Sequence, residues 1–345
     1  MSRSFNIAIV GATGNVGREI IQILEERNFN VDNIYFLASS HSKGKKIEFN
    51  KKEFIIEDLK DFDFSKVDIG LFSAGSSVSS KYAPIAESKN CLVIDNTSYF
   101  RMDKEIPLII PEVNGKILSD FFDNKNRRNI ISNPNCSTIQ MLVALKPIHD
   151  AAIINRIVVS TYQSVSGGGK NSMDELFEQT KDIYSNKNIQ PKAFTKQIAF
   201  NAIPHINSFC ENGDTKEEEK MINETKKILD PNIQITATCV RVPVFISHAE
   251  SINIELDSPL SDIEAKKILE NFDGVSVFDH RKDGGYITPI DAAGENKVFV
   301  SRLRIDNSIE NGLNMWVVSD NLRKGAALNA IQIAELVIEK YADDL

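Results

Sequence analysis

The chain has 345 residues, 42% of them hydrophobic and 26% charged, and a chain of this length is expected to form two domains. The formal net charge of -8 argues against a nucleic-acid surface, which needs a basic patch, and no apolar run approaches the ~18 residues of a membrane span. No two of the four cysteines form a Cys-x-x-Cys pair and the five histidines are scattered, so we expect neither a metal site nor a disulfide scaffold.

The first element is an apolar strand followed by a glycine-rich turn and an amphipathic helix, in FNIAIVGATGNVGREIIQILEERNF. No signal-peptide pattern precedes the strand, so we expect a cytoplasmic protein. The turn follows G-x-x-G-x-x-G, and its glycines let the backbone approach a pyrophosphate at the helix N-terminus. We therefore predict a dinucleotide site with these contacts: Gly11, Thr13, Gly14, Asn15, Val16 and Gly17.

The second strand leads into SSHSKGKK, and neither Asp nor Glu stands at its end, where NAD-binding folds usually place one on the ribose hydroxyls. Asp32 lies before the strand, at the wrong end. A carboxylate would repel a 2′-phosphate, whereas hydroxyls and cations would hold it. NADP is therefore the predicted cofactor, and a solvated basic turn is the alternative. The predicted contacts are Ser39, Ser40, His41, Ser42 and Lys43.

Three further strands are predicted at residues 67–75, 91–100 and 106–114, with a helix in SSKYAPIAESKN between the first two. Alternating strands and helices with buried β-branched runs indicate an α/β fold with a parallel, doubly wound sheet of the Rossmann type. Such folds bind ligands at the carboxyl edge of the sheet. We therefore add to the cofactor site the residues that end strand 67–75: Ser73, Ala74 and Gly75.

A candidate nucleophile, Cys136, lies in SNPNCSTIQMLVALKPI. Pro134 biases Asn133 toward extended geometry and apolar residues then recur at helical spacing, so a helix is predicted to begin close to Cys136. Unpaired N–H groups and the positive end of a helix dipole stabilise a thiolate, which is the nucleophilic form of cysteine. The alternative is a small buried residue, the usual state of a free cysteine.

After Cys136 the pattern changes to alternating apolar and polar residues, at 154–169, 232–246, 250–258 and 298–306. Antiparallel strands with one covered face show this pattern, so a second, α+β domain is predicted. The tail NLRKGAALNAIQIAELVIEKY is a long amphipathic helix that is expected to return to the first domain. The predicted domains are residues 1–133 completed by 321–345, and residues 134–320.

Six motifs spread over nearly the whole chain: GATGNVG, SNPNCSTIQ, YQSVSGGG, EEEKMINETKKIL, RVPVFISHAE and NLRKGAALNA. Together they resemble the aspartate-semialdehyde dehydrogenase family, within the glyceraldehyde-3-phosphate-dehydrogenase-like group. The resemblance implies NADPH-dependent reduction of L-4-aspartyl phosphate to the semialdehyde with release of phosphate, for lysine, threonine, methionine and diaminopimelate biosynthesis. It also implies a homodimer, with residues 134–320 as the catalytic and dimerisation domain. One departure is His41, where the family commonly has arginine beside the 2′-phosphate.

The resemblance implies that the Cys136 thiolate attacks the acyl phosphate and that the resulting thioester accepts hydride. It assigns His248 as the acid/base partner, with a pKa suited to proton transfer near pH 7. Arg241 would hold the substrate carboxylate as a bidentate clamp. Arg241 and His248 are seven residues apart, which would put them on opposite faces of one continuous strand. A bend near Pro243 or at Ser247 is therefore required.

The remaining implied roles are phosphate binding by Arg101 and Lys220, carbonyl orientation by Gln163 and Asn135, a substrate contact by Glu217, and nicotinamide contacts by Ser166, Gly167 and Asn321. Taken alone, the stretch TKEEEKMINETKK is typical of a solvated helix face, which would leave Lys220 without a function. His248 alone would be an ordinary core or strand-end histidine.

Three alternative functions stay open. N-acetyl-glutamyl-phosphate reductase shares the fold and the chemistry, but the EEEK and RVPVFISHAE motifs fit it less well. A non-catalytic NADP-binding sensor would make Cys136 structural. A methyltransferase would use the glycine turn for S-adenosylmethionine and would leave the Ser/Lys cluster after the second strand unexplained.

Overall fold

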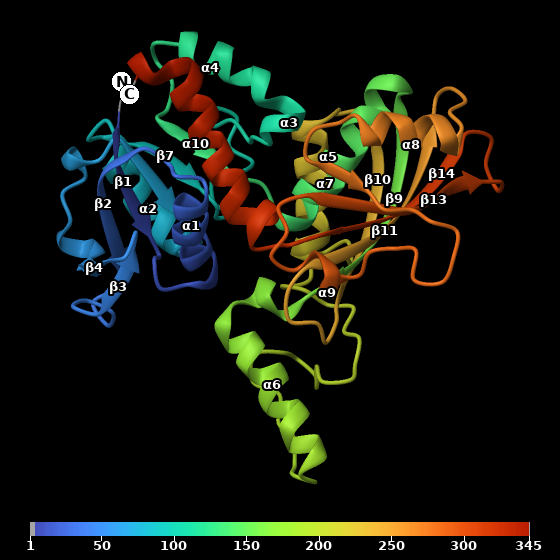
Figure 1. The fold of residues 1–345 in the computed structure, drawn as a ribbon, viewed down its shortest axis with the longest axis horizontal. Helices are drawn as coiled ribbons and strands as arrows, with labels where there is room; N and C mark the ends of the chain where they lie inside the picture. The colour runs from blue at the N-terminus through green and yellow to red at the C-terminus, as the bar shows by residue number, and fades with distance from the viewer. Residues whose placement is uncertain (1–3, 345) are drawn as a thin grey trace. The chain divides into compact units, whose positions relative to one another are not determined.

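The computed structural model describes residues 4–344 (Figure 1). The chain divides into two compact units, one made of the described residues up to Asn135 together with those from Ala326 onward, and one made of Cys136–Gly325. Each unit has its own six-stranded sheet. Within residues 4–344, no helix has the length and apolar character needed to cross a membrane. The functions expected of the two domains remain predictions.

The first unit is built on a parallel sheet in the order β5-β2-β1-β6-β7-β8, which confirms the predicted doubly wound fold. The central strands are buried because helices cover both faces of the sheet. The strands are β1 (Phe5–Val10), β2 (Val31–Ala38), β5 (Glu57–Asp58), β6 (Ile69–Phe72), β7 (Leu92–Asp95) and β8 (Ile130–Ser132).

Helices α1 (Asn15–Glu26) and α10 (Leu328–Tyr341) pack on one face of this sheet, and α2 (Ser76–Glu87) packs on the other. Alternate residues of β1 serve the two faces, because side chains of a strand point up and down in turn. The chain leaves β1 toward β2 and returns to pair β6 on the opposite side. Ligands bind at such a switch point, outside the carboxyl ends of the strands.

The smaller elements of this unit are the hairpin β3 (Lys46–Phe49) and β4 (Lys52–Ile55), and the short helices α3 (Pro111–Asn114) and α4 (Leu118–Asp123). The strand predicted over residues 106–114 is wrong. This segment makes one isolated bridge, from Leu108, and then enters α3. Pro107 lacks the N–H that a ladder needs, and proline at the first helical position favours a helix start.

The second unit is built on a mixed sheet in the order β10-β9-β11-β14-β13-β12, seen as adjacent strands in Figure 1. Its strands are β9 (Ile154–Gln163), β10 (Gln234–Arg241), β11 (His248–Leu256), β12 (Val275–Val277), β13 (Val298–Asp306) and β14 (Gly312–Ser319). The expectation of antiparallel strands holds for β9, β11, β14 and β13 but not for β10, which pairs with β9 in parallel, or for β12, which is parallel to β13. Alternation of apolar residues reports a covered face and carries no information on strand direction.

One face of this sheet is covered by α5 (Cys136–Ala151), α7 (Lys216–Ile228) and α8 (Asp262–Glu270). Every residue of α5 from 137 to 145 is buried, so the helix is covered around most of its circumference. The remaining helices are α6 (Lys170–Tyr184), which protrudes from this unit in Figure 1, and the short α9 (Pro289–Ala292).

Candidate active site

Three predicted site residues meet at one end of the second sheet. Arg241 ends β10 and is paired with Gln163, which ends β9. Strand β11 pairs with β9 on the side opposite β10, and its residue Ala249 lies across from Tyr162. His248 begins β11, one residue before Ala249. The chain turns between Arg241 and His248, and Ser247 has a φ of 74°, which confirms the predicted bend. The two residues therefore flank Gln163 from neighbouring strands.

The candidate nucleophile stands at the start of α5, as the sequence predicts, and its side chain is partly exposed. A Cβ added at Gly325 would lie 2.9 Å from the Cys136 Cβ, so only glycine leaves room beside the cysteine. The charge of Cys136 is also close enough to Arg241 to raise the pKa of that guanidinium, although burial has the larger, opposite effect. A thiolate here would face both a helix N-terminus and a buried cation.

The His248 ring is held by Ser164. The Ser164 backbone N–H donates to Nδ1 at 3.0 Å, and the Ser164 hydroxyl lies 3.1 Å from the same atom. Because Nδ1 accepts a hydrogen bond, a neutral ring carries its proton on Nε2. Within residues 4–344, Nε2 has no hydrogen-bond partner, and a Cβ at Gly167 would come within 3.3 Å of it. Nε2 is therefore the ring nitrogen that the described part of the fold leaves without a partner.

The expected pKa near 7 for His248 does not fit its surroundings. Complete burial, followed by the positive charge of Arg241, lowers the pKa of His248 to about 3, against a smaller raising effect of Glu217. The ring is neutral at neutral pH in this environment. The sequence could not reveal this, since the seven-residue spacing does not show that the arginine lies beside the histidine in space.

The guanidinium of Arg241 is buried and donates from Nη1 to the Ser164 carbonyl at 2.6 Å. Burial lowers its pKa, and the negative charges of Glu217, Cys136 and Cys239 partly offset that effect. An arginine keeps its proton even so, which makes Arg241 a fixed cation in the site. Its planar fork suits a carboxylate.

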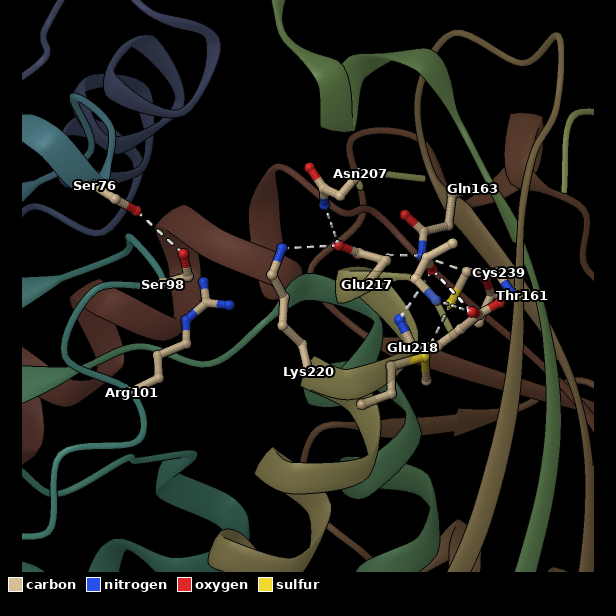
Figure 2. Close-up of polar contacts among 12 residues, drawn as sticks. Ser76, Ser98, Arg101, Thr161, Gln163, Asn207, Glu217, Glu218, Lys220 and Cys239 are labelled. Atoms are coloured by element: carbon tan, nitrogen blue, oxygen red, sulfur yellow. Dashed lines mark hydrogen bonds and ion pairs between the residues drawn. The ribbon is translucent and has the colours of Figure 1, made fainter. Parts of the chain in front are cut away.

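Glu217, in the first turn of α7, collects three polar side chains (Figure 2). Its carboxylate accepts from Lys220 Nζ at 2.9 Å, from Asn207 at 3.1 Å and from Gln163 at 3.4 Å. The Glu217 side chain is 6% exposed and that of Lys220 is 26% exposed. This face of α7 is therefore buried against the sheet and is not the solvated face that the charge pattern alone suggests.

The predicted nicotinamide contacts form a tight polar cluster in this unit. Asn321 Oδ1 accepts from the hydroxyls of Ser164 and Ser166 at 3.1 Å and from the Ser247 N–H at 2.9 Å. Asn321 Nδ2 donates back to Ser166 at 2.9 Å. Asn321 thus holds together the loop after β9 and the residue before His248. Whether Ser166, Gly167 and Asn321 also touch a cofactor stays a prediction.

In the first unit, the predicted pyrophosphate turn follows β1. A Cβ at Gly11 would lie 2.9 Å from the Ala74 backbone N, so glycine is required where the turn passes the end of β6. Gly14 and Gly75 precede α1 and α2, and neither helix start is capped by a side chain. Gly75 has a φ of 95° and open space where a Cβ would stand. Uncapped N–H groups at the sheet edge suit the phosphates of a dinucleotide.

The turn after β2 carries the predicted 2′-phosphate contacts. Ser39, Ser40, His41 and Lys43 are exposed, whereas Ser42 is buried. Lys43 makes an exposed ion pair with Asp61 at 3.3 Å. The sequence did not reveal Asp58, which pairs with Ala38 at the end of β2 and is hydrogen-bonded by Ser40. The residues of β5 are too few to give a strand pattern, so this carboxylate could not be placed beforehand.

The strand expected over residues 91–100 is shorter than predicted and ends with β7 at Asp95. The Asp95 carboxylate accepts from the Thr97 N–H at 3.0 Å and the Ser79 hydroxyl at 2.8 Å, which turns the chain. Arg101 follows this turn and is buried, and it donates to the carbonyls of Asn133 at 2.9 Å and Asn96 at 2.8 Å. Asn135, at the end of this unit, is also buried.

Sequence reasoning missed three polar or tightly packed positions in the second unit. Ser164 binds both His248 and Arg241, Asn207 binds Glu217, and Gly325 packs on Cys136. Ser164 and Gly325 lie inside the quoted motifs YQSVSGGG and NLRKGAALNA, so their motif position was an available signal. Asn207 lies in an irregular loop and had none.

Comparisons with known proteins cover almost the whole chain. The family described as "Semialdehyde dehydrogenase, NAD binding domain" matches residues 6–120, and "Semialdehyde dehydrogenase, dimerisation domain" matches residues 145–324. A protein of Rickettsia bellii named aspartate-semialdehyde dehydrogenase is 50% identical over 341 residues, covering 99% of this chain and 100% of its own. One of the same name from Aquifex aeolicus is 52% identical over 340 residues, covering 97% and 98%.

Solved structures agree with these matches. The crystal structure of aspartate semialdehyde dehydrogenase II from Vibrio cholerae, complexed with ASA, has a TM-score of 0.95 and 50% identity, and covers 99% of this chain and 100% of that chain. The Candida albicans enzyme with NADP has a TM-score of 0.77 at 22% identity, covering 99% and 100%, and at that identity the likeness shows the fold alone.

Proposed function

Since this chain belongs to the aspartate-semialdehyde dehydrogenase family, we propose that it converts L-4-aspartyl phosphate into L-aspartate 4-semialdehyde and phosphate, with NADPH as the reductant. The reaction serves lysine, threonine, methionine and diaminopimelate biosynthesis. The observation that supports it most directly is the meeting of Arg241, Gln163 and His248 at the ends of three adjacent strands. Cys136 lies close enough to Arg241 for a negative charge on its sulfur to raise the pKa of the guanidinium.

The proposed nucleophile is the Cys136 thiolate. It attacks the acyl carbon, a C–S bond forms, and the C–O bond to phosphate breaks with its electron pair leaving on the phosphate. Bound NADPH supplies a hydride for the carbonyl of the resulting thioester. The C–S bond then breaks, the aldehyde is released and Cys136 regains its thiolate. Gln163 and Asn135 orient the carbonyl during these steps.

The proposed proton carrier is His248, acting at Nε2. Its pKa of about 3 in the surroundings described would keep it from holding the thiol proton of Cys136. The substrate brings a carboxylate and a phosphate, and negative charge near a histidine favours the imidazolium. We therefore expect substrate binding to raise the pKa of His248 and to favour the tautomer with its proton on Nδ1, where the Ser164 hydroxyl lies 3.1 Å away, so that Nε2 can take the Cys136 proton when substrate arrives.

The charged groups of the substrate have candidate partners among the cationic and acidic side chains described above. Arg241 suits the carboxylate, and the buried Glu217 suits the ammonium group of the amino acid. Lys220 and Arg101 are assigned to the phosphate. The ion pair between Lys220 and Glu217 keeps the lysine at the site edge, where an incoming dianion can share its charge.

The turn after β2 supports NADP as the proposed cofactor, because its exposed hydroxyls and Lys43 could hold a 2′-phosphate. The carboxylate of Asp58 lies at the same strand end and would favour ribose hydroxyls instead. The ratio of kcat/KM for NADP to that for NAD measures which influence prevails. A ratio below one would reverse the assignment.

The test of the proposed function is the phosphate-dependent reduction of NADP by aspartate semialdehyde, run beside N-acetylglutamate semialdehyde. We expect activity with the first substrate only. Cys136→Ala should abolish turnover while NADP binding survives, and Cys136→Ser should retain at most a trace, because an ester is less electrophilic than a thioester. Cys210→Ala, a partly exposed cysteine of the same unit, is the matched control and should stay active. Activity of Cys136→Ala would contradict the mechanism.

A further inference from the structure

A buried polar pair lies one layer behind the proposed active site. Glu250 stands two residues after His248 on β11, so both side chains point to the sheet face that α5 covers. Gln140 stands one helical turn after Cys136 on α5. Both Glu250 and Gln140 are 0% exposed. One member of the pair therefore shares an element with the nucleophile, and the other shares an element with the histidine.

Within residues 4–344, the groups that shift the pKa of Glu250 are its buried surroundings and the Gln140 amide, and no cation is among them. Its strand neighbours are Thr161 on β9 and Val317 on β14. A negative charge on Glu250 is one of the effects that raise the pKa of the Cys239 thiol on β10. The Gln140 amide is the polar group that acts on the carboxyl. Among residues 4–344, no other side chain or backbone group makes a hydrogen bond of regular geometry with the polar atoms of Glu250 or Gln140.

Burying an ionised carboxylate without an ion partner costs free energy, so burial raises the pKa of Glu250 well above its ordinary value. The protonated acid and the primary amide are complementary. The acid O–H can donate to Gln140 Oε1 while Gln140 Nε2 donates to the acid carbonyl. Such a pair would give a partner to the acid O–H, to the acid carbonyl, to Gln140 Oε1 and to one of the two Gln140 N–H groups, which an apolar core otherwise leaves orphaned.

We propose that Glu250 keeps its proton and, paired with Gln140, is a positioning residue that ties the helix of Cys136 to the strand of His248. This inference rests on the proposed function, because that function assigns the two residues being positioned. A leucine pair could fill the same space, so the pair is expected to contribute register between α5 and β11 more than stability.

The experiment compares Glu250→Gln with Glu250→Leu in the full chain. The neutral amide can replace the neutral acid, so Glu250→Gln should keep kcat within about threefold of the wild type. Glu250→Leu removes the tie and should lower kcat roughly tenfold or more, with Michaelis constants little changed, because small misplacements of reacting groups are costly. Glu255→Gln, a partly exposed glutamate on the same strand, is the matched control and should have no effect.

Two further measurements keep the proposal open to contradiction if Glu250→Leu folds poorly. Infrared spectra at neutral pH should show a protonated carboxyl band in the wild type that is missing in Glu250→Gln. The double variant Gln140→Leu/Glu250→Leu should be more stable than the two single effects predict, because it leaves no orphaned partner.

The outcomes separate this inference from the proposed function. Loss of activity in Glu250→Gln equal to that in Glu250→Leu, absence of the infrared band, or unchanged kcat in Glu250→Leu would overturn the positioning role. A lowered melting temperature with unchanged kcat would show a structural role only. Activity of Cys136→Ala would instead contradict the proposed function, whatever the Glu250 variants do.

Discussion

Single residues of the site act through their neighbours, and His248 is the clearest case. Its neutral state depends on burial and on Arg241, and its orientation depends on Ser164. Unfolding returns the ring to water, where it takes up a proton with an ordinary pKa. The folded protein therefore binds fewer protons at this position than the unfolded chain between about pH 3 and pH 6.5.

This difference predicts a loss of stability in acid. Stability from neutral His248 is present above pH 6.5 and declines as the pH falls toward about 3. From pH 7 to pH 5 the wild type should lose about 2 kcal/mol more unfolding free energy than His248→Asn, measured by urea denaturation. The exposed His41→Asn variant should follow the wild type. Equal losses in wild type and His248→Asn would show that the ring does not stay neutral in the fold.

The two cationic side chains near Glu217 should separate kinetically. Lys220→Ala should raise the Michaelis constant for phosphate about tenfold or more and leave that for semialdehyde nearly unchanged, because a charge-assisted bond contributes about 1.5–3 kcal/mol. Arg241→Lys should do the reverse, because lysine lacks the planar fork. The phosphorylating oxidation assay measures both constants. Lys216→Ala, exposed on the same helix, is the control. Indifference to Lys220→Ala would leave its assigned role wrong.

Among the elements, α7 shows how a helix start can serve a site. Thr215 and Glu218 form a capping box, and the other oxygen of Glu218 accepts from the Cys239 N–H of β10 at 2.9 Å. The cap thereby fixes the first turn, which carries Glu217, against the sheet. Of the three consecutive glutamates in this turn, Glu217 faces the site and Glu218 fixes the helix start to the sheet.

We expect Thr215→Ala to lower the unfolding free energy by about 1 kcal/mol, the usual cost of losing an N-cap, and also to raise the Michaelis constant for phosphate. Ser261→Ala removes the equivalent capping box of α8 and is the matched control. It should have the same cost in stability with unchanged kinetics. Denaturation and initial-rate measurements on both variants decide the matter. A kinetic effect shared by both would mean general loosening.

For the whole molecule, the face of the second sheet opposite α5 carries an aromatic pair, Tyr162 and Trp316, with ring centroids 5.5 Å apart. Ser251 lies on the same face of β11 and is exposed. Aromatic residues are enriched at protein interfaces, and the family match names residues 145–324 a dimerisation domain. A homodimer through this face follows as an expectation.

Ser251→Arg should disrupt that homodimer, because it places an unpaired charge in the middle of the face. Sedimentation should show a mass of one chain for Ser251→Arg and of two chains for the wild type. Ser258→Arg, beyond the end of the same strand, should remain dimeric. A dimeric Ser251→Arg protein would place the interface elsewhere.

The sequence by itself determined the features that depend on neighbouring residues. The glycine turn after β1, the helix that begins at Cys136 and the buried faces of the strands follow from backbone preferences and side-chain period, which are local properties. The strand predicted at 106–114 was wrong, because Pro107 and Pro111 disfavour a strand although the segment is apolar. Motif resemblance supplied candidate residues for the site, but not their partners.

Only the tertiary structure decided which groups meet. The parallel pairing of β10 beside β9, the polar side chains gathered on Glu217 and the low pKa of His248 all depend on contacts between residues far apart in the chain. Glu250 is the same case, since the sequence does not show that this glutamate of an alternating strand is fully buried and that burial raises its pKa. Burial and charge are properties of the assembled neighbourhood, and a linear pattern does not encode them.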